Sequence, residues 1–80
     1  MTTLVTDQVA VESLAVSRPD ILGGKPVFRG TRVPVHYLFD YLAQGLSLDY
    51  FLETFPSVTR ECAVQVLRYG QWEIEHALDA

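Results

Sequence analysis

The cationic side chains of this sequence are gathered into one short stretch. Residues 18–32 hold four cations against one carboxylate, a net charge of +3: Arg18, Lys25, Arg29 and Arg32 against Asp20. Three prolines and three glycines in residues 19–35 indicate turns that keep these side chains in fixed positions. Because a fixed arginine suits bidentate contact with carboxylate or phosphate, the stretch predicts a focused binding surface. The alternative is a solvated loop whose cations balance acidic helices.

Residue types that carry out catalysis are present but scattered. His36 and His76 are far apart in the sequence, and neither lies at a metal-ligand spacing from Cys62. The run Gly23-Gly24-Lys25 lacks the spacing of a phosphate-binding loop. Cys62 falls early in an expected helix, where the helix dipole lowers a thiol pKa, but a half-buried structural thiol is the favoured interpretation. We therefore expect no enzymatic activity, no cofactor and no metal ion.

The last two expected helices and the turn between them have the lengths of a helix-turn-helix. The solvent face of the final helix would present Arg60, Gln65 and Arg68, residue types that read base edges in the major groove. Glu61 on the same face opposes such binding. DNA recognition by this helix and a purely structural three-helix core are therefore both left open.

Composition sets the class of protein. The 80 residues are 49% hydrophobic and carry a net charge of −4, which is typical of one small folded domain that does not bind nucleic acid by diffuse charge. Apart from the basic stretch, residues 1–17 carry −2 and residues 33–80 carry −5. No apolar run is long enough for a membrane span, residues 1–12 do not resemble a signal peptide, and a single cysteine favours the cytoplasm.

These chemical groups need elements to position them. Residues 1–13 are expected to form an N-terminal leader, either disordered or a short strand, and residues 14–80 a single domain. A β-hairpin is expected over about residues 26–34, with Gly30 at a position of positive φ, and Leu14-Ala15-Val16 is a candidate strand. Apolar periodicity then predicts helices over about residues 35–44, 47–55 and 59–78. The fold class is therefore mainly α, with a small N-terminal β-hairpin before three helices.

Capping residues and one glycine refine the helix predictions. Gly45 lies at a C-terminal cap, and Ser47 and Thr59 lie at N-caps. Gly70 falls on the apolar stripe of the last helix, and an in-phase stripe to Leu78 favours a continuous helix over a break. Trp72 lies off that stripe, either tucked under the hairpin or on a partner surface.

Two motifs resemble the signature of domain-of-unknown-function family 433: Gly23-Gly24-Lys25-Pro26-Val27 and Arg29-Gly30-Thr31-Arg32-Val33-Pro34-Val35. The resemblance continues through Gly45-Leu46-Ser47, Phe55-Pro56 and Thr59, and covers about residues 14–69. It implies a small β-hairpin followed by a homeodomain-like helix-turn-helix bundle. Many members resemble VapB-like antitoxins, which are paired with a PIN-like ribonuclease toxin in a two-gene operon. The leader and residues 71–80 lie outside the pattern.

The resemblance leads to the first functional hypothesis, an antitoxin that silences a PIN-like nuclease and represses its own operon. PIN-type sites are carboxylate clusters around a divalent metal, so a fixed arginine is a suitable plug. The expected toxin contacts are Lys25, Arg29, Arg32 and Trp72, on a turn framework of Gly23, Gly24, Gly30, Thr31 and Pro34. The alternatives are a DNA-binding regulator without a toxin partner, acting on operator DNA, and a structural homodimer joined through Val66, Gly70 and Ile74.

Overall fold

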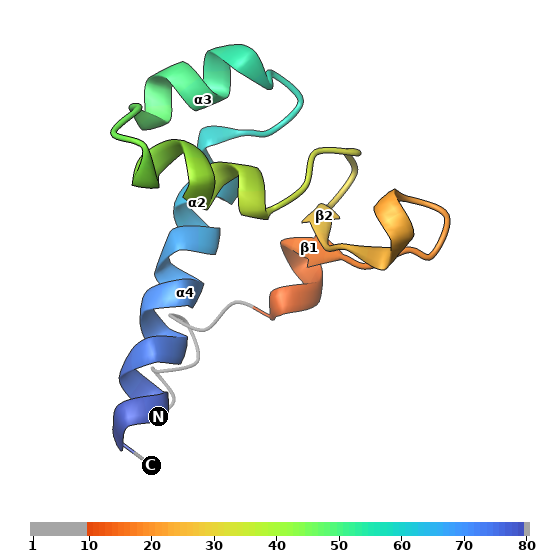
Figure 1. Ribbon diagram of the computed structural model, residues 1–80. Coiled ribbons are helices and arrows are strands. Elements are labelled where there is room, and N and C mark those ends of the chain that lie inside the picture. The colour runs from red at the N-terminus through yellow and green to blue at the C-terminus, as the bar shows by residue number, and fades with distance from the viewer. Residues whose placement is uncertain (1–9, 80) are drawn as a thin grey trace.

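A two-stranded sheet precedes three helices in the computed structural model, of which we describe residues 10–79 (Figure 1). The elements are η1 (Val11–Ser13), β1 (Ala15–Val16), η2 (Leu22–Gly24), β2 (Val27–Phe28), α2 (His36–Ala43), α3 (Leu48–Thr54) and α4 (Arg60–Asp79). This order confirms the expected fold class, a small antiparallel sheet followed by three helices. The expectation of a disordered leader or a strand falls mostly on residues 1–9, which lie outside the described residues, whereas Val11–Ser13 is a 3-10 turn.

The sheet differs in detail from the expected hairpin. β2 pairs antiparallel with β1, in the register Ala15 to Phe28 and Val16 to Val27. The chain after the Arg29-Gly30 turn contributes only one isolated bridge, between Val27 and Pro34. Two hydrogen bonds make this bridge: the Phe28 N–H donates to the Val33 carbonyl at 2.9 Å, and the Val35 N–H donates to the Pro26 carbonyl at 3.0 Å. Because α2 begins at His36, the returning segment pairs no further, and β1 is the partner strand of β2.

The helices begin and end at the capping residues that the sequence indicates. The Ser47 hydroxyl accepts from the Tyr50 N–H at 3.0 Å, and the Thr59 hydroxyl accepts from the Cys62 N–H at 3.1 Å. Gly45, at φ 88°, follows α2, where its N–H donates to a carbonyl of the last turn. Each cap satisfies a main-chain group that the helix itself leaves without a partner.

The core lies where the sheet meets the three helices. Val27 and Phe28 from β2, Leu38 from α2 and Phe51 from α3 are completely buried, and the rings of Phe28 and Phe51 lie 6.1 Å apart. Phe28, Leu38 and Phe51 form one core cluster with Leu14, Val58, Ala63 and Val66. The buried side chains of β2 therefore pack the sheet against the helices and fix the position of the Arg29-Gly30 turn that follows β2.

α4 is continuous through Gly70, as the apolar stripe indicates. A Cβ built on Gly70 would lie 3.6 Å from two atoms of the Phe39 ring. Phe39 of α2 therefore lies close to α4 at Gly70, and the helix continues through this glycine. Beyond this point the helix extends away from α2 and α3 (Figure 1). Ile74 and Leu78, which continue the apolar stripe, are 64% and 83% exposed, so the stripe is part of the core only as far as Gly70.

Candidate functional site

The basic residues surround a tight turn whose main chain is held by several hydrogen bonds. The Thr31 N–H donates to the Phe28 carbonyl at 3.0 Å, and Gly30 adopts φ 77° between them. The Thr31 hydroxyl donates to the same carbonyl at 2.8 Å and accepts from the Val33 N–H at 3.0 Å. This geometry is that of a turn in which the third position requires a left-handed residue, so glycine fits it without strain.

Arg29 is anchored at both its main chain and its side chain. Its N–H donates to the Leu14 carbonyl at 2.9 Å, and its guanidinium Nη1 donates to the Glu12 carbonyl at 3.0 Å. The guanidinium has five N–H donors, so this contact leaves most of them for a ligand. Arg29 is exposed and its position is set by the protein.

Arg32 and Lys25 are exposed on either side of this turn. Among residues 10–79, neither side chain forms a hydrogen bond or an ion pair. We name the segment Arg29–Arg32 the basic turn. It combines a fixed main chain with the anchored guanidinium of Arg29 and that of Arg32, which has no polar partner in the described part of the chain.

The Gly23-Gly24 segment forms a second fixed loop beside the sheet. Gly23 and Gly24 adopt φ 64° and 92°, and Leu22 before them also has a positive φ of 50°. The Ser17 hydroxyl donates to the Gly24 carbonyl at 2.7 Å and closes the loop. Pro34, the last of the expected framework residues, is buried and forms the bridge to β2. Sequence reasoning missed Leu22, because a branched side chain gives no signal of a left-handed backbone.

An apolar groove lies between η1, the sheet, α2 and α4. It encloses about 190 Å³ and is lined by Val11, Leu14, Ala15, Pro26, Val35, Phe39, Val66, Tyr69 and Gly70. A second, more open recess of about 370 Å³ shares Pro26, Val35 and Phe39 with it and is bordered by Lys25 and His36. We refer to the first as the apolar groove. The shared residues place Lys25 at one end of it.

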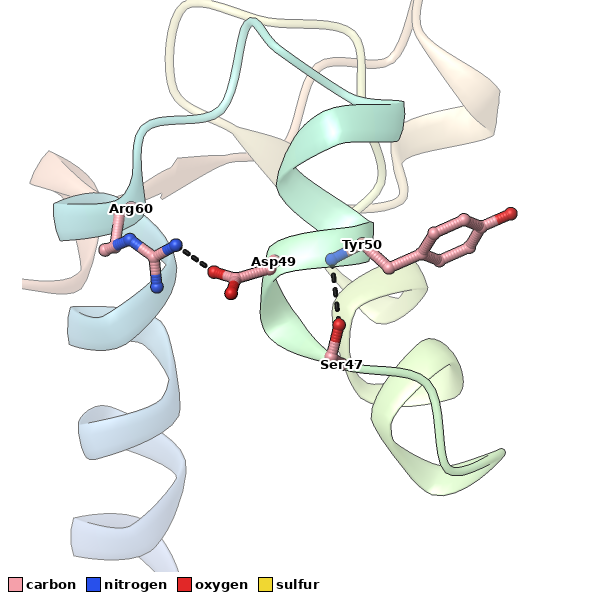
Figure 2. A network of polar contacts seen from close by, with 4 residues as sticks. All are labelled: Ser47, Asp49, Tyr50 and Arg60. Atoms are coloured by element: carbon pink, nitrogen blue, oxygen red, sulfur yellow. Dashed lines mark hydrogen bonds and ion pairs between the residues drawn. The ribbon is translucent and has the colours of Figure 1, made fainter.

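The expected DNA-reading residues lie on the first half of α4. Arg60 forms an ion pair with Asp49 of α3, as Figure 2 shows beside the Ser47 cap. Both partners are well exposed, so this pair contributes little to stability and can open. Arg68 is exposed, whereas Gln65 is half-buried. The structure therefore leaves Arg68 accessible and holds Arg60 beside α3.

Trp72 lies half-buried in an aromatic stack on α4. Its ring centroid is 5.9 Å from that of Tyr69 and 4.0 Å from that of His76, and its Nε1 is buried. The apolar side chains exposed at this end of α4 are instead Ile74 and Leu78. A hydrogen bond of 2.8 Å from the Tyr69 hydroxyl to Glu73 raises the pKa of Tyr69.

The remaining chemically active residues have structural surroundings. Burial, and then the Glu61 carboxylate, raise the pKa of the Cys62 thiol, which lies 3.8 Å from the Leu14 carbonyl. This favours the structural interpretation of Cys62. Within residues 10–79, no three His, Cys, Asp or Glu side chains gather closely enough to hold a metal ion. No helix in the described part of the chain is both long and apolar enough to cross a membrane.

Comparison with known proteins shows the family to which the chain belongs. The model of the family described as "Protein of unknown function (DUF433)" matches residues 16–70, a segment that contains the Gly23-Gly24 loop and the basic turn. This chain belongs to the DUF433 family. The uncharacterized protein y4eO of Sinorhizobium fredii is 47% identical over 55 residues, which are 69% of this chain. The chain spans only about a quarter of that relative, since the match covers 25% of its length.

A solved structure supports the same assignment. The crystal structure of a DUF433 member from Anabaena variabilis is similar to this chain with a TM-score of 0.66 and 25% sequence identity. The similarity covers 95% of this chain and 80% of the other. This DUF433 protein therefore has a fold similar to that of the solved member.

Proposed function

We propose that this DUF433 protein is an antitoxin that inhibits a PIN-like ribonuclease by presenting the basic turn to the carboxylates of its active site. The observation that carries the proposal is the fixed geometry of residues 28–33. The Arg29 guanidinium is already held by the Glu12 carbonyl and so loses little side-chain entropy on binding, whereas the fixed main chain of the turn sets the position from which Arg32 extends.

The charges favour such a partner. Residues 18–32 carry a net charge of +3, whereas residues 1–17 and 33–80 carry −2 and −5. A carboxylate cluster on a partner would therefore be attracted to the basic stretch and repelled by the net negative charge of the remaining chain. Arg32, which is free of other contacts among the described residues, is the first candidate for entry into the nuclease site. Arg29 and Lys25 then border the contact.

The proposal predicts that a neighbouring gene encodes a PIN-like protein, and the test is an inhibition assay with that protein. The two proteins should co-purify, and Arg32→Ala combined with Arg29→Ala should relieve inhibition by at least about tenfold, the loss expected for one close charge pair. Arg18→Ala and Arg68→Ala are matched controls, since both residues are exposed arginines outside the basic turn. Unchanged inhibition by the double variant would refute the proposal.

A second candidate function is DNA binding, by which the same protein represses its operon. The observation in its favour is the exposure of Arg60 and Arg68 on α4, after the turn that follows α3. A gel shift with the upstream DNA should weaken with rising salt and with Arg68→Ala. Absence of a shift at low salt, with and without the nuclease, would remove this function.

A further inference from the structure

The last turns of α4 form an apolar surface that the described core does not cover. All described side chains from Glu73 to Leu78 are exposed, and Ile74 and Leu78 are the two most exposed large apolar residues of the described chain. They lie four residues apart, so they project from the same side of the helix. We name residues 73–78 the α4 tail. Covering these two side chains with a partner would remove apolar surface from water, which is favourable.

The same chain contains a receptor that matches this surface. The apolar groove encloses about 190 Å³ and has an entirely apolar lining, a size suited to one or two aliphatic side chains. Its α4 wall, Val66 and Gly70, belongs to the helical stripe that continues to Ile74. The groove and the α4 tail are therefore neighbouring parts of one apolar surface. In a symmetric dimer the tail of each copy can lie in the groove of the other.

Charge matches as well as shape. The α4 tail carries Glu75 between its two apolar residues, whereas the recess that continues the groove is bordered by Lys25. Within one chain the α4 tail and the recess bordered by Lys25 are separated, because the end of α4 extends away from η2 and β2 (Figure 1). A second copy brings them together.

We infer that the occupant of the apolar groove is the α4 tail of a second copy of this chain, in a two-fold dimer. Ile74 and Leu78 of one copy enter the groove of the other, and Glu75 lies at the end that carries Lys25. A two-fold axis makes each contact occur twice, so a modest surface gains a doubled contribution. In this interface Ile74 and Leu78 are the entering side chains, whereas Val66 and Gly70 only line the receiving groove, where Val66 is buried and the Phe39 ring lies near Gly70.

The dimer predicts which substitutions weaken it. Sedimentation equilibrium of the full chain should show a concentration-dependent dimer, and Leu78→Asp should weaken association by about tenfold or more, as expected for loss of a large buried apolar side chain. Leu78 is 83% exposed, so the variant should keep its helical circular dichroism. Leu46→Asp, which places a carboxylate on an exposed leucine between α2 and α3, is the matched control and should leave association unchanged.

A charge exchange tests the occupant of the groove. Lys25→Glu and Glu75→Lys should each weaken self-association, and a one-to-one mixture of the two variants should restore it, because both contacts are complementary only in the mixed dimer. Both residues are exposed, so neither change disturbs the fold.

Four results would overturn the inference. They are a monomer at millimolar concentration, a dimer that Leu78→Asp leaves intact, a mixture that recovers nothing, and an α4 tail that binds only the nuclease. Lys25 takes part in both the dimer and the proposed inhibition. Leu78→Asp leaves Lys25 and the basic turn unchanged, so this variant distinguishes failure of the dimer from failure of the inhibition.

Discussion

Two identical substitutions at two glycines should have opposite effects on the free energy of unfolding. Gly70→Ala should stabilise the protein by about 1 kcal/mol, the difference in helix propensity between the two residues. The added Cβ would lie 3.6 Å from the Phe39 ring, which is ordinary van der Waals contact, so packing does not oppose the gain. For a domain of this size the melting temperature should rise by about 4–8 °C.

Gly45→Ala should destabilise the protein by about 1 kcal/mol. Gly45 adopts φ 88°, a conformation in which the Cβ of an L-residue crowds the backbone, although no other group lies within 4 Å of the position. The pair therefore separates a backbone effect from a packing effect, with the same methyl group added in both cases.

The assay is urea denaturation followed by helical circular dichroism, at one fixed protein concentration because association adds to apparent stability. Equal midpoints for the wild-type protein and Gly70→Ala, or a lower midpoint for the variant, would refute the continuous helix and its spacing from Phe39. A stabilising Gly45→Ala would refute the left-handed cap.

Three further predictions follow from single contacts. Ser47→Ala should lower the free energy of unfolding by about 1 kcal/mol through loss of the N-cap, whereas Ser57→Ala should have little effect; equal effects in urea denaturation would contradict the cap. Thr31→Val should cost about 1–3 kcal/mol, because its hydroxyl makes two main-chain hydrogen bonds, and should weaken nuclease inhibition; unchanged stability would show that the hydroxyl does not hold the turn. The pKa of Tyr69, read by carbon NMR, should fall in Glu73→Gln, since the accepting carboxylate is lost; the stabilising contact is present below the unfolded tyrosine pKa and is lost as pH rises through the folded value. A pKa that does not change would exclude that hydrogen bond.

The sequence predicted those parts of the fold that depend on local signals. The helices followed from apolar spacing, and Gly45, Ser47 and Thr59 marked their ends because capping is a local hydrogen-bonding requirement. Gly30 likewise indicated the turn at which the structure has a positive φ.

Parts that depend on distant contacts could not be predicted in the same way. β1 is separated from β2 by the η2 loop, and no local pattern shows that it, rather than the chain after Gly30, is the main partner of β2. The apolar stripe of α4 continues in phase past Gly70, yet periodicity does not reveal where the described core ends, and the structure leaves Ile74 and Leu78 exposed.

The candidate site shows the same division. The basic turn was evident from composition, and the structure places Arg29 and Arg32 on one fixed segment. The contact of Arg29 with the Glu12 carbonyl, the pairing of Arg60 with Asp49 and the stacked position of Trp72 depend on tertiary geometry. The sequence therefore identified which residues carry the charge, and the structure shows which guanidinium is free of contacts among the described residues.

The most direct test of the proposed plug is a double-mutant cycle between Arg32 and one active-site carboxylate of the nuclease. Binding is measured for both wild-type proteins, for Arg32→Ala, for the carboxylate changed to its amide, and for the two changes together. Direct contact predicts a coupling energy of at least about 1.5 kcal/mol, as close charge pairs at interfaces give. Additive effects of the two changes would contradict entry of Arg32 into the nuclease site.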